Sequence, residues 1–233
     1  MKKDFENLII KPIATIKTDF TTKFAIPRQG SISSSINGQI IFEKEYRKEG
    51  ILRGLEDFSH IWLIWGFNNF DFTKEFAPTI RPPKLGGNKK VGVFASRSPN
   101  RPNPLGMSVV KIEKIDYEDK KSPIILVSGV DLMDGTPIYD IKPYIPFSDS
   151  ISDAKEGYTA FTRNIKKLKV IIQDELKKEL PQDKLDCLIE TLSYDPRPGY
   201  EHDNSKIYGF KYLDKEIKFH VEDDSILYID NIF

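Results

Sequence analysis

The sequence predicts a mainly β protein, with an antiparallel barrel or sandwich followed by a small α+β segment. Between residues 8 and 129, strand-like apolar segments recur without the helical stretches of ten to fifteen residues that connect parallel strands. None of the glycine patterns of dinucleotide- or phosphate-binding folds occurs. Helical spacing of leucines appears only near the C-terminal end. A doubly wound parallel sheet is therefore excluded.

The N-terminal strands are expected in six segments: residues 8–16, 31–42, 60–67, 91–95, 107–115 and 122–129. Pro12 places the first at a sheet edge or bulge, because proline lacks a backbone donor. Asn37-Gly38 between alternating segments predicts a hairpin turn. The segment His60–Phe67 is apolar on both faces and predicts a fully buried strand. Residues 43–58 predict a short helical or turn element.

The composition changes after about residue 150, where a polar linker is expected at residues 151–157. Beyond it, the sequence predicts a strand at 169–173, a short charged helix ending before Pro181, a helix at 183–192 and strands at 207–213, 216–221 and 226–229. We therefore predict an N-terminal barrel domain at residues 1–155 and a small α+β C-terminal domain at residues 160–233.

A proline-framed loop follows the fourth predicted strand, in the stretch VGVFASRSPNRPNPLG at residues 91–106. Its prolines exclude a helix or a central strand, and its serine and asparagine side chains favour turns. The loop is therefore expected to hold Arg97 and Arg101 at fixed positions.

The charge around this loop is segregated. The chain balances 35 basic against 35 acidic residues, yet residues 76–112 contain no acidic residue and seven basic ones. Such a basic segment in a neutral protein indicates an anionic partner. The alternative is a solvated basic loop without a partner. A binding site is favoured because the planar guanidinium of arginine can form paired hydrogen bonds with phosphate or carboxylate.

Two further segments carry candidate site residues. Asp134-Gly135 predicts a tight turn whose backbone is open to a ligand. Asp140, Lys142 and Tyr144 then alternate, so they share one face of an extended chain. That face is either the floor of a pocket or a surface hairpin with a weak ion pair.

The loop YDPRPGY at residues 194–200 has a composition similar to that of the first loop, with Arg197 between two prolines and Asp195 nearby. Tyrosines next to a rigid arginine can stack on a base and bind its phosphate. A simple turn between elements is the alternative.

Several functions are excluded. The lone Cys187 forms no disulfide framework or cysteine metal site, and no histidine pair has metal-ligand spacing, so no metal site is expected. No Ser/His/Asp or Cys/His arrangement is present. The start of the chain lacks a signal-peptide pattern and the longest apolar run is too short to span a bilayer. We expect a cytoplasmic protein with no membrane association.

The central loop motif VGVFASRSPNRPNPLGMS, together with DGTPIYDIKPYIPFSDS and DPRPGY, resembles the TsaA/TrmO-like family of tRNA methyltransferases. Further matches are FAIPRQG, RGLEDFSHIW and RPPKLGGN, so the resemblance spans nearly the whole chain. It implies an antiparallel β-barrel homodimer that transfers a methyl group from S-adenosylmethionine to N6 of threonylcarbamoyladenosine beside the anticodon.

The resemblance also implies residues that contact S-adenosylmethionine. These are Pro27, Arg28, Gln29, Asn68, Asn69, Arg97, Leu105, Asp134, Gly135, Thr136 and Pro137. Family members often have histidine where Asn68 stands, so a hydrogen-bonding role is expected at this position instead of a proton relay.

Roles in the reaction follow as hypotheses. N6 is a poor nucleophile, so an acceptor for its proton is needed, and Asp140 and Asp195 are the candidates. Arg197 or Lys142 is expected to hold the threonyl carboxylate, and Arg101 and Tyr144 are further candidate substrate contacts. Two alternatives stay open: a non-enzymatic RNA- or nucleotide-binding barrel, and a small-molecule methyltransferase.

Overall fold

A computed structural model describes residues 8–26, 35–68, 70–71, 73, 75–82, 89–162 and 167–233 of the chain. Its strands are β1 (Ala14–Thr18), β2 (Asn37–Phe42), β3 (His60–Gly66), β4 (Thr79–Ile80), β5 (Val91–Gly92), β6 (Leu105–Asp116), β7 (Ile124–Ser128), β8 (Thr136–Pro143), β9 (Lys169–Ile172), β10 (Tyr208–Tyr212), β11 (Lys215–Glu222) and β12 (Ile226–Ile232). Its α-helices are α1 (Pro146–Asp149), α2 (Asp174–Lys177) and α3 (Gln182–Ser193). Short 3₁₀ turns cover Lys44–Tyr46, Leu55–Asp57, Val93–Ala95 and Gly157–Thr162.

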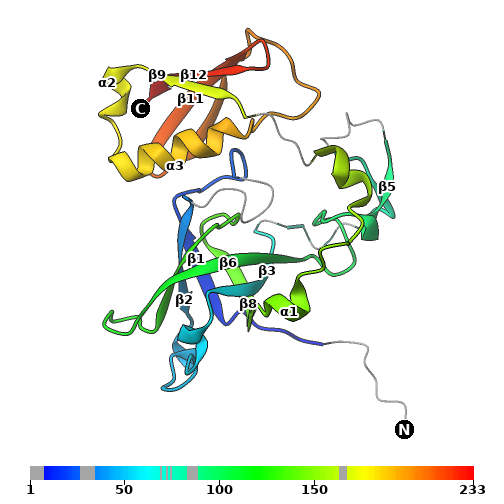
Figure 1. The fold of residues 1–233 in the computed structure, drawn as a ribbon, viewed down its shortest axis with the longest axis vertical. Coiled ribbons are helices and arrows are strands. Elements are labelled where there is room, and N and C mark those ends of the chain that lie inside the picture. Colours follow the sequence, from blue (N-terminus) through cyan, green and yellow to red (C-terminus); the bar gives the residue numbers. More distant parts are fainter. Residues whose placement is uncertain are drawn as a thin grey trace.

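The N-terminal part is a closed barrel in the order β1-β2-β7-β6-β3-β8, with β8 pairing back onto β1 (Figure 1). Every neighbouring pair is antiparallel. Closure leaves no free strand edge, which removes a site of unwanted pairing. The predicted mainly β fold is confirmed, and the barrel is the form that it takes.

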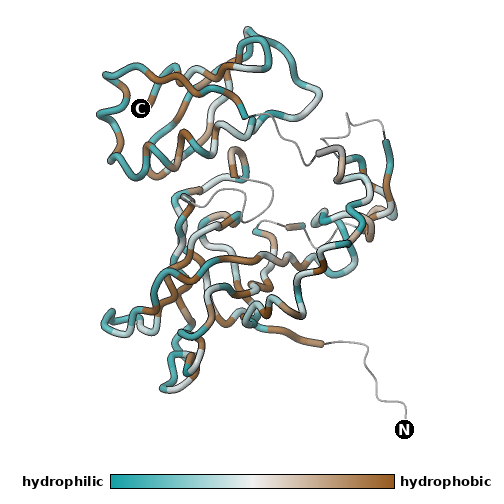
Figure 2. Tube along the Cα trace, viewed as in Figure 1, coloured by the Kyte–Doolittle hydropathy of each residue, from teal (hydrophilic) through white to brown (hydrophobic). Residues whose placement is uncertain are grey.

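Burial alternates along the barrel strands, because successive side chains point to opposite faces. In β3, Ile61 and Leu63 are fully buried inside the barrel, whereas His60 and Trp62 are partly exposed on its outer wall. The prediction of a strand buried on both faces was therefore wrong in its outer face. Figure 2 shows hydrophobic residues mainly along the strands and hydrophilic ones in the connecting loops.

Two local predictions were wrong. Asn37-Gly38 opens β2 instead of forming a hairpin turn, and Gly38 pairs with Val127. A Cβ on Gly38 would lie 3.0 Å from Cδ1 of Ile16, so the glycine serves close packing. The apolar run at 91–95 forms only the two-residue strand β5, which pairs with β4, before a 3₁₀ turn.

The C-terminal part confirms the expected elements. Its sheet has the order β10-β11-β12-β9, with β9 parallel to β12. Leu185, Leu188 and Leu192 of α3 are buried at helical spacing, and the helix lies on the side of the sheet that faces the barrel (Figure 1). Within the described residues, no helix has the length and apolarity needed to cross a membrane.

The connection that follows β1 joins the barrel to the C-terminal sheet. Phe20 is fully buried and its ring centroid lies 5.1 Å from that of Tyr212. Asp19 accepts a hydrogen bond from the backbone of Leu213 and forms an ion pair of 2.6 Å with Lys184 of α3. One continuous cluster of buried side chains therefore runs through both parts of the chain.

Phe24→Ala tests this junction. The ring of Phe24 lies 6.1 Å from Tyr208 and Phe219 of the C-terminal sheet, and it is partly buried. Loss of this packing is expected to lower the free energy of unfolding by about 1–2 kcal/mol. Thermal unfolding followed by circular dichroism measures it. Tyr117→Ala, at an exposed hairpin, is the control and should change little; equal melting temperatures for both variants would contradict the junction.

Candidate active site

A cavity of about 1040 Å³ lies at one end of the barrel, where β1, β3 and β7 end and β6 and β8 begin. Its described lining residues are Lys23, Ile26, Ile64, Trp65, Phe67, Asn68, Ile80, Arg81, Pro82, Ser96, Arg97, Ser98, Pro99, Arg101, Leu105, Gly106, Met107, Asp131, Leu132, Met133, Thr136 and Tyr158. Segments far apart in the sequence thus meet at one place. The volume is typical of a small-molecule site.

The proline-framed loop forms one wall of this cavity and is cross-linked by its own hydrogen bonds. Arg101 lies inside it: Nε donates to the carbonyl of Ser98 at 3.0 Å, and Nη2 donates to the carbonyls of Val93, at 3.1 Å, and Ser96. Ser98 Oγ accepts from the backbone of Asn100. The guanidinium of Arg101 therefore holds the loop together, a role that the sequence did not indicate.

Arg97 has a different environment. Its side chain is exposed at the cavity, and no hydrogen-bond or ion-pair partner is found for it among the described residues. Lys23 and Arg81 also line the cavity. The segregated basic segment thus contributes cationic side chains to the site, with Arg97 available to bind an anion.

The predicted turn Asp134-Gly135 lies between the lining residues Met133 and Thr136, but neither its two residues nor Pro137 lines the cavity. Oδ1 of Asp134 accepts a hydrogen bond of 3.0 Å from the backbone of Thr18, and the backbone of Gly135 donates to Ile16 at 2.9 Å. Gly135 has φ +73°, which favours glycine. Asn68 Nδ2 donates to the carbonyl of Asp134 at 3.0 Å. The turn is therefore fixed against β1 and against the end of β3.

Asn68 also presents an unpaired acceptor. Its Oδ1 is buried and, within the described part of the chain, has no hydrogen-bond partner. A buried polar atom without a partner costs free energy, so this atom is suited to accept an N–H group from a ligand in the cavity. Of the cofactor contacts implied by the resemblance, Asn68, Arg97, Leu105 and Thr136 line the cavity together. Pro27, Arg28, Gln29 and Asn69 lie outside the described residues.

Asp140, Lys142 and Tyr144 share one face, as predicted, but it is the outer face of the barrel. Lys142 Nζ lies 3.0 Å from Asp140 Oδ2, and about half of each side chain is exposed. The ring of Tyr144 lies 5.8 Å from that of Trp62. None of the three lines the cavity. The structure thus corresponds to the surface alternative for this segment.

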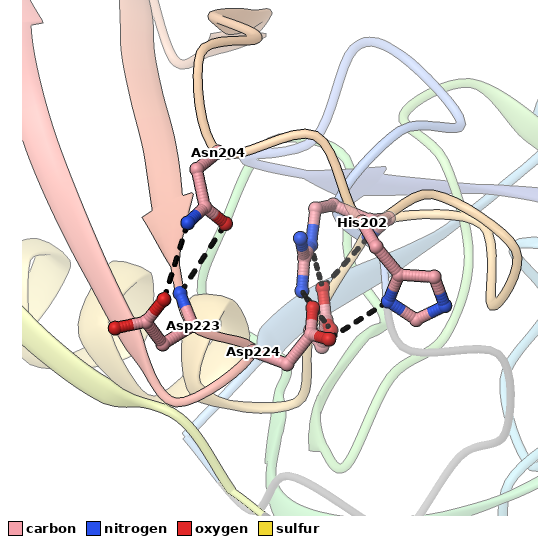
Figure 3. A network of polar contacts seen from close by, with 6 residues as sticks. His202, Asn204, Asp223 and Asp224 are labelled. Atoms are coloured by element: carbon pink, nitrogen blue, oxygen red, sulfur yellow. Dashed lines mark hydrogen bonds and ion pairs between the residues drawn. The ribbon is translucent and has the colours of Figure 1, made fainter.

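Arg197 and Asp195 belong to an ion-pair network of the C-terminal part and do not line the cavity. Figure 3 shows His202 and Asp224 of this network. The side chain of Arg197 is 2% exposed; Nε lies 2.9 Å from Asp195 and Nη2 lies 2.8 Å from Asp224. His202 Nδ1 lies 2.8 Å from the other oxygen of Asp224. With its guanidinium buried between two carboxylates, Arg197 orders its own loop and is not open to a substrate carboxylate.

Sequence reasoning missed a polar chain beside the cavity. Trp65 Nε1 donates to Ser108 Oγ at 3.0 Å, and Ser108 Oγ donates to Asp131 Oδ1 at 2.6 Å. The available signal was a serine in the apolar strand β6 and an aspartate three residues before the Asp134-Gly135 turn. Neither has a spacing that distinguishes it from an ordinary strand or turn residue.

Comparisons with known proteins agree with this arrangement. The family model described as the tRNA-methyltransferase O N-terminal domain matches residues 15–150, and the TrmO C-terminal domain model matches residues 165–232. A tRNA (adenine(37)-N6)-methyltransferase of Escherichia coli K12 is 38% identical over 225 residues, which cover 91% of this chain and 92% of the relative.

Two further proteins are similar over most of the chain. A protein named putative S-adenosylmethionine-dependent methyltransferase RcsF, from Pseudomonas aeruginosa, is 34% identical over 221 residues, covering 91% of each chain. The crystal structure of TrmO from Pseudomonas aeruginosa has a TM-score of 0.76 at 27% identity, covering 97% of this chain and 99% of the other.

Fold, cavity and relatives together define a methyltransferase built on an antiparallel β-barrel instead of a Rossmann sheet. More particularly, the chain belongs to the TrmO family, whose two domain models account for most of its length.

Proposed function

We propose that this chain transfers a methyl group from S-adenosylmethionine to N6 of the adenosine beside the anticodon of tRNA, and that this adenosine carries a threonylcarbamoyl group. The observation that carries the proposal is the barrel-end cavity, which both Asn68 and Arg97 line. Among the described residues, Asn68 Oδ1 is a buried acceptor without a hydrogen-bond partner, and the side chain of Arg97 is exposed. A site of this kind can receive a donor molecule and an anionic RNA together. Asn68 and Arg97 are the residues that we assign to the donor.

The cavity suits S-adenosylmethionine, which when bound supplies a methyl group already activated on a sulfonium. Apolar side chains such as Leu105, Met107 and Leu132 line the space and offer the donor an apolar surface. Asn68 Oδ1 accepts an N–H group of the donor, and Arg97 holds its carboxylate by a charge-assisted hydrogen bond. The chain thereby aligns the donor for in-line attack.

The tRNA is bound by basic side chains around the cavity mouth. Arg81 lines the cavity, and Lys89 and Lys90 are exposed close by in the sequence. Neutralising phosphates releases counterions, so tRNA affinity should fall steeply with salt.

We further propose that the protein acts as a homodimer in the cytoplasm. The dimer is implied by the family resemblance, and Phe94 and Phe147, which are 80% and 93% exposed, are candidate contacts with the second copy.

Nucleoside mass spectrometry tests the function. Unmethylated tRNA is incubated with the protein and S-adenosylmethionine, then digested and compared with a reaction lacking the protein. One added methyl group on the modified adenosine is expected. Calorimetry with S-adenosylmethionine separates the alternatives, because a non-enzymatic RNA-binding barrel binds no donor. Donor binding without methylated nucleoside would instead favour a small-molecule methyltransferase.

Arg97→Ala is expected to weaken S-adenosylmethionine binding about 10- to 150-fold, because a hydrogen bond to a charged group contributes about 1.5–3 kcal/mol. Its melting temperature should not change, since nothing in the described fold holds the side chain. Arg101→Ala should lower the melting temperature, because the guanidinium binds three loop carbonyls. Arg53→Ala removes the same charge outside the cavity and is the control. Unchanged donor and tRNA affinity in Arg97→Ala would remove this residue from the site.

A further inference from the structure

The cavity contains a carboxylate with no assigned role. Asp131 lies on the connection between β7 and β8, and among the described residues that line the cavity it is the acidic one. Four cationic side chains line the same space: Lys23, Arg81, Arg97 and Arg101. A carboxylate is poorly suited to bind RNA phosphates, since like charges repel. Asp131 must therefore serve another purpose there.

Hydrogen bonds from neighbouring strands orient the Asp131 carboxylate. Ser108 is 4% exposed, and its hydroxyl donates to Asp131 Oδ1 at 2.6 Å. That hydroxyl is itself oriented by Trp65, whose Nε1 donates to it at 3.0 Å. The indole lies over Gly106, where a Cβ would be 2.3 Å from its ring atoms. Residues from β3 and β6 thus hold one carboxylate oxygen in place beside the cavity.

We propose that Asp131 is the proton acceptor of the methyl-transfer step, and that Ser108 and Trp65 are its positioning residues. The inference rests on the function proposed above. Asp131 takes the proton of N6 while N6 forms its bond to the methyl carbon; the C–S bond breaks and its electron pair stays on sulfur as a thioether. The proton then passes from Asp131 to water, so atoms and charge balance.

The chemistry requires such a group. The lone pair of N6 is delocalised into the purine ring, and a carbamoyl substituent withdraws it further. Attack on a methyl group is therefore slow unless the proton leaves as the bond forms. A positioned general base contributes about 10²–10⁴-fold to a rate. Asp131 meets the geometric condition that Asp140, on the outer barrel wall, and Asp195, in the C-terminal network, do not: it lines the cavity.

The test is Asp131→Asn, which keeps the shape of the side chain and removes its basicity. Three quantities are measured: the single-turnover methylation rate on unmethylated tRNA, the Kd for S-adenosylmethionine by calorimetry, and the melting temperature. We expect the rate to fall about 100-fold or more, with the donor Kd changed less than about threefold and an unchanged melting temperature. Asp119→Asn, on the β6–β7 hairpin, is the control and should keep the wild-type rate.

Two outcomes overturn the proposal. A donor Kd that weakens in proportion to the rate would make Asp131 a donor-binding residue. A rate within about tenfold of wild type, or a larger loss in Asp140→Asn, would move the proton to another group. If the wild-type protein itself methylates no tRNA, the proposed function fails first. Ser108→Ala should lower kcat and leave KM for the donor unchanged, as a positioning role requires; loss of the hydrogen bond from Trp65 should cost about 1 kcal/mol of stability.

Discussion

Gly106→Ala is expected to destabilise the barrel and to slow methyl transfer. A Cβ at this position would lie 2.3 Å from Cε2 and Cζ2 of Trp65, so the indole must move or β3 and β6 must separate. Overpacking of this kind costs about 1–3 kcal/mol, and loss of the Trp65–Ser108 hydrogen bond adds about 1 kcal/mol. Urea unfolding measures the loss of stability, and the methylation rate measures the effect on methyl transfer.

The matched control is Gly92→Ala. A Cβ on Gly92 meets no atom within 4 Å, and its φ of −61° is open to any residue. This variant should unfold at the wild-type urea concentration. In a Trp65→Leu background, Gly106→Ala should lose most of its cost, because coupled neighbours are not additive. Equal unfolding of Gly106→Ala and Gly92→Ala would mean that the indole does not lie over Gly106 in solution.

Arg197→Met is expected to lower the free energy of unfolding by about 3 kcal/mol, the lower end of the cost of removing one partner from a buried ion pair. The lower end applies because solvent reaches half of the Asp224 side chain. Lys218→Met removes an exposed partner of Glu216 in the same sheet and should cost less than about 1 kcal/mol. Thermal unfolding distinguishes the two variants. A similar melting temperature for both would contradict a structural role for Arg197.

The effect of Arg197→Met should also depend on pH. The hydrogen bond from Arg197, supported by His202, lowers the pKa of Asp224 below its usual range. A lowered folded-state pKa gives stability that is present above the unfolded value, near 4, and is lost as pH falls through the folded value. Wild type and variant should therefore differ most at neutral pH and converge below about pH 4. Urea unfolding at both pH values measures this difference.

Much of the fold followed from local pattern. The sequence predicted β6, β7 and α3 to within a few residues, as strands at 107–115 and 122–129 and a helix at 183–192. These elements could be predicted because the spacing of apolar residues along a short stretch, every second residue or every 3.6 residues, distinguishes a strand from a helix. Asn37-Gly38 failed for a non-local reason. Its glycine is needed for contact with Ile16 of the neighbouring strand, and the turn statistics of the dipeptide do not include that partner.

The candidate site likewise contains features that depend on local sequence and features that depend on contacts between distant residues. The position of Arg97 at the cavity and the turn at Asp134-Gly135 agree with proline framing and turn chemistry, which are local, while their roles in the site stay predictions. Arg197 was misplaced because the same proline framing surrounds a buried arginine, and its partner Asp224 is 27 residues away. Asp131 and Ser108 were missed because they meet only through the register of the long β6–β7 hairpin, which residue type alone does not reveal. A sequence pattern identifies rigid loops, but it does not say which of their charges face the cavity.

The junction after β1 has a consequence for synthesis of the chain. Phe20 and Phe24 are synthesised with the first barrel strand, whereas the aromatic residues that cover them, Tyr208, Tyr212 and Phe219, are synthesised only after the last barrel strand. Until then the nascent barrel presents an uncovered aromatic surface. Premature termination before β10 would leave that surface permanently open, so truncated products are expected to aggregate or to be retained by chaperones, however complete their barrel.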